Sequence, residues 1–562
     1  MKKTLHHLFT SAWLAIQKQW PYIGVFCFVI VLCFPFWSQP DFVFMGLISG
    51  DNIASPWFYD FVSRHAYAQQ PIDFLVDFNY PTPIARQIEF PNYWDALLLA
   101  PLAKFFGFPQ FWGVVITVAI LINAMSLAVL SRAIGGSPLG IFVAGVFGAS
   151  MRPVWVDIGF GRMNAVFIGY GVMAMAFVLL SIPKAKRHWG WTLVFSGLAC
   201  FFGFMAAQVY PPFLVLLFPI GVVLLKTRVH RDNWKWLGGP VFILFLTYWL
   251  VADDLMAMVD SHYRQLNCIE YDCPDAYHRT AFMNFFLFSN NGLSTIGLSG
   301  YAVVLGLGSI CLRHGQWWLR LSLFALLLLY GVLALGPCPV LYEDTPIQLP
   351  SWLSVLLQPL WCWGLQLHDF ARFASVFSVM IIVAISQFAS SIVSYRRWLK
   401  LCCFAFVGIA GLGNSIQLSL EINESRKWHP VDRPTAVPAF LLNQNGEPAV
   451  EFPYEKGLHV LSVLHAPKSP RVNPLRLSDK PKSKWVFFQW ADRIGRGKKS
   501  KQVPNKEQIN GSGVRWVFYE PSRCGKRFRH CPEWVLPHLT DVLGEPVELD
   551  EGVWMWDLWS PP

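Results

Sequence analysis

The sequence predicts a polytopic α-helical membrane protein with a soluble α/β domain at its C-terminal end. Hydrophobic residues make up 54% of the 562 residues and charged residues only 14%, whereas an average soluble protein has about 25% charged residues. Phe (46) and Trp (26) are abundant, which suits aromatic rings at membrane boundaries. Apolar runs fill the chain to about residue 417, and residues 418–562 have the mixed composition of a soluble domain.

The N-terminal segment, residues 1–20, predicts an amphipathic helix that lies on the cytoplasmic face of the membrane. Lys2, Lys3 and Lys18 flank apolar residues at roughly helical spacing. The apolar stretch comes late and no small-residue cleavage site follows it, so we do not expect a cleaved signal peptide.

Residues 21–417 predict about eleven transmembrane helices, several of them short for a hydrocarbon core of about 30 Å. The largest outer loop is expected at residues 38–109. The predicted spans are 22–37, 110–131, 137–151, 163–182, 191–208, 211–225, 238–254, 296–312, 318–336, 373–394 and 400–417.

Charge placement orients these spans. With the N-terminus in the cytoplasm, the inner segments hold sixteen basic residues and one acid, whereas the outer loops hold eight basic and seventeen acidic residues. This asymmetry follows the positive-inside rule, and an odd number of spans places residues 418–562 outside. The net charge of +10 is therefore the usual bias of cytoplasmic loops, and we expect no nucleic-acid partner.

Two outer loops and the tail contain further predicted elements. Residues 55–68 and 93–106 predict amphipathic helices in the first loop, and residues 151–162 form a short second loop. In the tail we expect strands at 449–452, 458–464, 485–490, 514–519 and 553–558 and a helix at 534–543. Outer cysteines come in three pairs, Cys268/Cys273, Cys338/Cys362 and Cys524/Cys531, which fits an oxidising compartment.

Several short motifs resemble one family. Gly50-Asp51-Asn52 is followed by Trp57-Phe58, and residues 90–102 read Phe-Pro-x-x-x-Asp-x-Leu-x-x-x-Pro-Leu. Residues 147–153 read Phe-x-x-Ser-x-x-Pro and precede a Gly-x-x-Asn at 161–164. With Arg372-Phe373 and the tail segment 513–517, this layout resembles bacterial multi-spanning glycosyltransferases of the GT-C class that carry a C-terminal soluble domain.

The resemblance implies an inverting transfer of a hexosyl or pentosyl group from a polyprenyl-phosphate carrier to a glycan, lipid or protein acceptor. Such an enzyme would lie in the bacterial inner membrane, with its C-terminal domain in the periplasm. Asp51 matches the first-loop acid that acts as general base in this class. The expected substrate-binding residues are Asn52, Asp60, Asp95, Asp157, Arg162, His368 and Arg372.

Several of these residues have both a functional and a simpler structural interpretation. Arg162 and Arg372 stand at outer ends of spans, where a guanidinium can bind a lipid-linked phosphate through two hydrogen bonds. They could equally be topology or interfacial charges. Asp51 could cap a helix near residue 55, and Asp95 could cap the helix after it. His368 and Asp369 could form a satisfied loop pair.

Other assignments stay open at this stage. No cofactor is assigned, although Asp51 with Asp157 could supply part of an oxygen site for Mg²⁺ or Mn²⁺. A flippase for a lipid-linked glycan and a non-catalytic envelope assembly protein are alternative functions. The flippase would favour charges inside the membrane, which the charge count does not need. The assembly protein is suggested by Gly161-Arg162, where the family often carries His.

Overall fold

The computed structural model divides the chain into two compact units, which we describe separately. A membrane unit comprises Met1–Gly46 and Pro91–Trp428, and a second unit comprises Leu47–Phe90 and His429–Pro562. The described residues are 19–38, 42–44, 55–63 without 57, 74–75, 84–85, 93–106, 110–159, 162–182, 189–209, 211–225, 317–335, 371–391, 429–430, 440–441, 443–444, 447–452, 486–521 without 496, 533–549 and 552–559, with single residues at 245, 249, 306, 350, 352, 356, 401, 405, 408 and 437.

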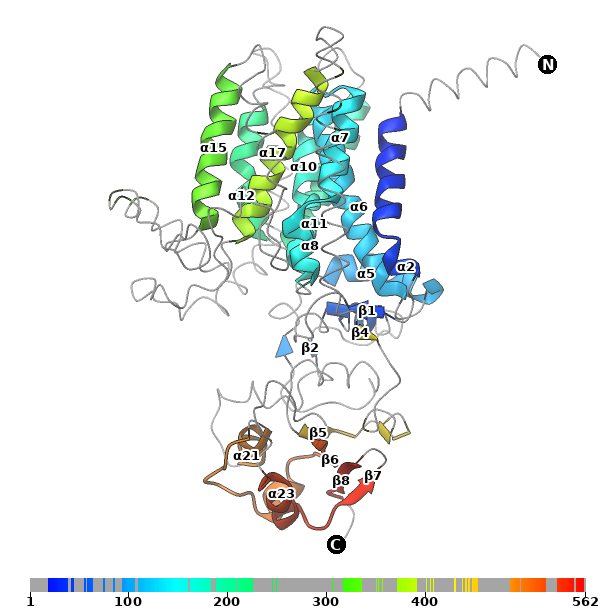
Figure 1. Cartoon of the computed structure of the whole chain (residues 1–562), viewed down its shortest axis with the longest axis vertical. Coiled ribbons are helices and arrows are strands. Elements are labelled where there is room, and N and C mark those ends of the chain that lie inside the picture. The colour runs from blue at the N-terminus through cyan, green and yellow to red at the C-terminus, as the bar shows by residue number, and fades with distance from the viewer. Residues whose placement is uncertain are drawn as a thin grey trace, which may run out of the picture. The chain divides into compact units, whose positions relative to one another are not determined.

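The membrane unit is a bundle of apolar helices (Figure 1). Five helical segments in the described ranges are long and apolar enough to cross a membrane: Gln110–Ala133, Pro138–Gly159, Met163–Ser181, Gly190–Gln208 and Phe373–Ser391. The elements are a helix at Gln19–Leu32, α2 (Pro35–Ser38), β1 (Phe42–Phe44), α5 (Tyr93–Phe106), α6 (Gln110–Ala133), α7 (Pro138–Ala149), α8 (Arg152–Gly159), α9 (Met163–Val166), α10 (Gly169–Ser181), α11 (Trp189–Val209), α12 (Pro211–Leu225), α15 (Trp317–Leu335) and α17 (Ala371–Ser391).

The predicted class of helical membrane protein is confirmed, while the number of spans stays a prediction. Helices cover eight of the eleven predicted spans. The other three, at 238–254, 296–312 and 400–417, fall almost wholly outside the described residues, as does the N-terminal amphipathic helix up to residue 18.

Contacts between helix ends show the relative directions of the helices. The backbone N–H of Ser137, just before α7, donates to Ser390 Oγ near the end of α17 at 2.9 Å. The rings of Tyr330, late in α15, and Phe373, early in α17, lie 6.4 Å apart between centroids. Helix α17 therefore runs antiparallel to both α7 and α15.

Glycines allow these helices to pack closely, as is common in membranes. A Cβ on Gly140 of α7 would lie 2.0 Å from Ser390 Oγ on α17. A Cβ on Gly145, five residues later, would lie 2.2 Å from Val25 Cγ2 on the first helix. Helix α7 is thus held between its neighbours on two faces.

The second unit contains a four-stranded sheet with the order β5-β6-β8-β7. Strands β5 and β6 are parallel, and the other two pairs are antiparallel. The elements are β2 (Phe74–Leu75), β3 (Ile84–Ala85), β4 (His429–Pro430), β5 (Ala449–Phe452), α21 (Val486–Gly495), α22 (Lys506–Asn510), β6 (Trp516–Tyr519), α23 (Val535–Leu543), β7 (Val547–Leu549) and β8 (Val553–Asp557). Strands β2 and β3 pair with each other, and residues 55–56 and 58–63 are helical.

Alternation along the strands buries both faces of this sheet. Val517 and Tyr519 of β6 point to one side, where they join the core formed with α21 and α23. Trp516 and Phe518 point to the other side and pack with Phe440. The sheet therefore lies between two hydrophobic layers, as an α/β domain requires.

One predicted strand, residues 485–490, is wrong, because this segment belongs to helix α21. Phe487, Trp490, Ala491 and Ile494 are all buried, and their spacing of three and four residues is that of one helix face. The clustered aromatic residues resemble a strand in composition, but their period is helical.

Candidate functional site at one end of the helix bundle

Polar and charged side chains of the membrane unit gather at one end of the bundle, which we call the α8 end. Helices α6, α10, α12 and α17 begin there, and α7, α11 and α15 finish there, as follows from their alternating directions and short connections. Only residues 107–109 separate α5 from α6, so α5 lies at the same end (Figure 1). The predicted second outer loop is not a loop but forms α8.

Helix α8 is folded into the bundle rather than exposed above it. Trp155 is fully buried, and its Nε1 donates to the Ala149 carbonyl at 2.8 Å. Its ring stacks on Phe36 of α2 with centroids 6.2 Å apart. Phe36 lies in α2 near the end of the first predicted span, so that end of the span lies beside α8.

Helix α8 also carries two buried charged residues, Arg152 and Asp157. Their exposed fractions are 6% and 7%. Burying a charge in an apolar bundle is costly unless other groups compensate for it, so such residues are uncommon without a function. The backbone N–H of Arg162 donates to the Asp157 carbonyl at 2.8 Å, which anchors the half-buried Arg162 next to α8.

Asp95 provides a third buried charge at this end. It is fully buried in α5 and lies within the first turn of the helix, so the predicted role as an N-cap is wrong: α5 begins two residues earlier, at Tyr93. The neighbouring Trp94 packs edge-on against Phe204 of α11 at 5.4 Å. Because Asp95 is fully buried, its carboxylate lies inside the bundle.

The other predicted site residues divide into three groups. Asp51, Asn52 and His368 lie outside the described residues. Asp60 is half-buried in the second unit, and its carbonyl accepts a hydrogen bond from Ser63 Oγ at 2.7 Å. Arg372 belongs to the first turn of α17, which the backbone places at the α8 end.

The structure adds Arg152 to the candidate residues. Sequence reasoning counted Arg152 only as an outer-loop charge. A possible signal was its position in an otherwise apolar stretch, directly before Pro153. In the ranges that the structure describes, no three His, Cys, Asp or Glu side chains form a group that could hold a metal ion.

Comparison with known proteins supports the fold. The sequence matches no family model and no curated protein. The cryo-EM structure of the arabinofuranosyltransferase AftD from Mycobacteria aligns with a TM-score of 0.58 at 12% identity over 97% of this chain, and its R1389S mutant aligns with a TM-score of 0.59 at 13% identity. The chain spans only 40–42% of the length of those proteins.

A third solved structure is ArnT from Cupriavidus metallidurans bound to undecaprenyl phosphate. It aligns with a TM-score of 0.47 at 12% identity, over 98% of this chain and 100% of that one. The likeness to AftD carries the conclusion on architecture. The chain has the fold of the GT-C class of membrane glycosyltransferases.

Proposed function

We propose that the protein is a membrane glycosyltransferase that moves a sugar from a polyprenyl-phosphate-linked donor to an acceptor on the periplasmic side of the bacterial inner membrane. The observation that carries the proposal is the set of buried charges, Asp95, Arg152 and Asp157, at one end of a bundle with the fold of an arabinofuranosyltransferase. Charges buried at the edge of an apolar bundle suit a substrate that is half lipid and half phosphate.

The reaction needs a base, a cation and a place for the carrier lipid. In the proposed step, Asp51 takes the proton of an acceptor hydroxyl. The acceptor oxygen attacks the anomeric carbon from the side opposite the phosphate. The bond from that carbon to the phosphate oxygen then breaks, and polyprenyl phosphate leaves with the electron pair. The configuration at the anomeric carbon is inverted.

Arginines at the α8 end are suited to stabilise the departing phosphate. Arg152 and Arg162 lie on and directly after α8, and Arg372 begins α17. A guanidinium donates two parallel hydrogen bonds to a phosphate. Because Arg152 is removed from water, it would stabilise the negative charge of the leaving group more strongly than an exposed cation does.

Charge asymmetry supports a periplasmic α8 end. Arg132 is in the last turn of α6 and Arg320 in the first turns of α15, so both lie at the opposite end of the bundle. The predicted inner segments, to which both belong, hold sixteen basic residues and one acid, whereas the predicted outer loops hold eight basic and seventeen acidic residues. Basic residues prefer the cytoplasmic end of spans. The acid-rich outer loops would then lie in the periplasm, together with residues 418–562.

Transfer can be measured with the purified full-length chain in lipid nanodiscs. Donors would be polyprenyl phosphates that carry arabinofuranose or single hexoses, and mass spectrometry would follow both the release of polyprenyl phosphate and the glycosylated acceptor. Envelope lipids and glycans from a deletion strain would supply acceptors. The proposal expects both products in equal amounts. Movement of intact donor across the bilayer without release of the sugar would instead identify a flippase.

A further inference from the structure

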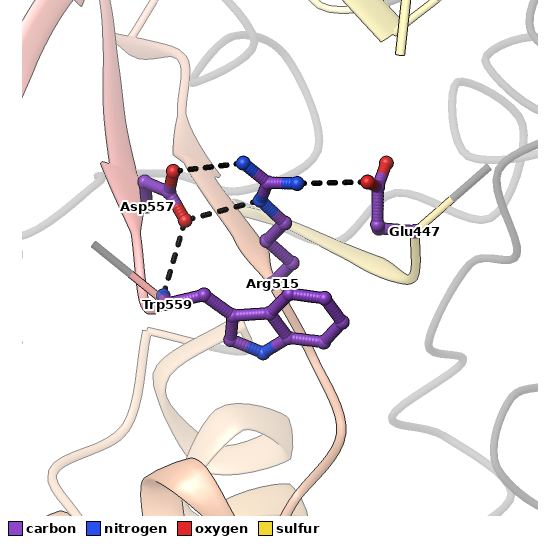
Figure 2. A network of polar contacts seen from close by, with 4 residues as sticks. All are labelled: Glu447, Arg515, Asp557 and Trp559. Carbon is purple, nitrogen blue, oxygen red and sulfur yellow. Dashed lines mark hydrogen bonds and ion pairs between the residues drawn. The ribbon is translucent and has the colours of Figure 1, made fainter. Parts of the chain in front are cut away.

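The second unit contains an arginine that is fixed on three sides (Figure 2). Arg515 Nη1 donates to Glu447 Oε1 at 2.7 Å, while its Nε and Nη2 each donate to the Asp557 carboxylate at 3.3 Å. The guanidinium also lies 4.4 Å from the ring centroid of Trp516 and 5.5 Å from that of Trp559. Ion pairing and stacking together fix its plane.

The same network fixes Trp559 at the surface. Its backbone N–H donates to Asp557 Oδ1 at 3.1 Å, and the residue is 54% exposed. It takes no part in either hydrophobic core of the unit. A large apolar ring that is both rigid and exposed is a ready contact surface, because little conformational entropy is lost when it binds.

Arg515 retains hydrogen-bonding capacity beside this ring. Its side chain is 27% exposed. Three of the five guanidinium N–H groups bond to the two carboxylates within the described residues, so two remain for water or a ligand. The surface therefore combines an aromatic face with fixed polar donors.

The two carboxylates compensate the charge of the arginine. Arg515 contributes one positive charge, and it pairs with one carboxylate each from Glu447 and Asp557. Arg515 therefore has no uncompensated positive charge to offer a phosphate or carboxylate ligand. A neutral ligand with hydroxyl groups and an apolar face does not need such a charge.

We propose that Trp559 and Arg515 form a binding surface for a neutral saccharide. One face of a sugar ring carries several C–H bonds, whose weakly positive hydrogens fit the negative face of an indole. Its hydroxyl oxygens accept hydrogen bonds from the two remaining N–H groups of Arg515. The carboxylate pair holds the arginine in position, and the ring of Trp559 supplies the contact area.

This saccharide surface does not depend on the proposed transfer reaction. All of its residues belong to the second unit, so binding can be measured without a donor lipid. Loss of transfer by the membrane unit and loss of saccharide binding here are separate results.

The test is saturation-transfer-difference NMR on the full-length chain in nanodiscs. The probes are neutral hexasaccharides of glucose, mannose, galactose and arabinose, with a hexamer of galacturonic acid as the anionic counterpart. Wild type is expected to bind at least one neutral hexamer and to bind the anionic hexamer at least tenfold more weakly. Trp559→Ala should weaken binding at least tenfold. Trp191→Ala is the matched control, because Trp191 is 56% exposed on α11 of the membrane unit.

Three outcomes would overturn the proposal: no neutral hexamer binds at 10 mM, Trp559→Ala binds like wild type, or the anionic hexamer binds best. Arg515→Lys is a second variant. It retains the charge but loses the planar donors, so it should weaken saccharide binding. Circular dichroism and the melting temperature of both variants establish that the chain remains folded.

Discussion

The side-chain amide of Asn123 on α6 bonds to both sides of the break between α9 and α10. Its Nδ2 donates to the Val166 carbonyl at 2.8 Å, and its Oδ1 accepts from the Gly169 N–H at 2.7 Å. Both backbone groups would otherwise be unsatisfied in an apolar bundle. This clamp fixes the start of α10, and with it the position of Arg162 just after α8.

Gly169→Ala is expected to disrupt this clamp. A Cβ there would lie 2.5 Å from Asn123 Oδ1 and 2.8 Å from its Cα, and such overpacking typically costs about 1–3 kcal/mol. We expect a lower apparent melting temperature in detergent. The matched control is Gly197→Ala on α11, where an added Cβ meets no atom within 4 Å. Equal melting temperatures of the two variants would show that the clamp is not needed.

Arg152→Met is expected to weaken the binding of polyprenyl phosphate itself at least tenfold, because the variant lacks the buried guanidinium that we assign to the phosphate. Arg152→Lys should retain part of the affinity, since it keeps the charge without the fork of donors. The control is Arg132→Met, which removes an exposed cation at the opposite end of the bundle. Binding can be measured by native mass spectrometry, and unchanged affinity in Arg152→Met would remove this residue from the site.

Arg515→Lys is expected to destabilise the second unit by about 1 kcal/mol, the range of partly exposed ion pairs. The side-chain hydrogen bonds with Asp557 are the main reason that the pKa of Arg515 lies above its usual value. Lysine cannot reproduce the paired bonds or the stacking on Trp516. Hydrogen exchange of β6 and β8 in the full chain should become faster. Exchange at the wild-type rate would contradict a stabilising role.

His538 makes the second unit less stable in mild acid. Its Nε2 accepts a hydrogen bond from Nε1 of the buried Trp490 at 3.1 Å, which requires a neutral ring. Burial lowers the pKa of His538 below its usual value of 6.5, and Lys499 lowers it further, whereas Asp541 acts in the opposite direction.

The sign of the effect follows from this lowered pKa. Above pH 6.5 the His538 ring is neutral in both the folded and the unfolded chain, and the full stability of the second unit is present. As the pH falls below 6.5, the unfolded chain takes up the proton first, so stability is lost. Hydrogen exchange of α21 and α23, corrected for intrinsic rates, should accelerate more between pH 7.5 and 5.5 in wild type than in His538→Gln. Identical responses would contradict this role.

Segments with a strong local pattern were predicted well from the sequence. Helix α5 and strand β5 have the predicted bounds, 93–106 and 449–452. Turn and breaker residues flank the α5 segment, and the β5 segment is a short run of residues that favour strands. Helix α21 was mistaken for a strand because the prediction relied on its aromatic composition and not on the helical spacing of these residues.

The candidate site was less accessible to sequence reasoning, since it depends on contacts between distant segments. The stretch from Arg152 to Gly159 has the charges and proline of an exposed loop, yet it is a buried helix held by Trp155 and Phe36. Hydropathy describes how polar a segment is, but not whether neighbouring helices cover it. The complete burial of Asp95 on α5 is equally invisible to local patterns.

The most direct test of the proposed transferase is the rate of sugar transfer by Asp51→Asn in nanodiscs. Asparagine keeps the size of the side chain but cannot accept the proton of the acceptor hydroxyl. The proposal predicts a loss of at least 100-fold in the rate of transfer, with unchanged melting temperature and unchanged affinity for polyprenyl phosphate. Asp73→Asn, in the same first loop, should transfer at the wild-type rate. Full activity of Asp51→Asn would contradict the assignment of Asp51 as the base.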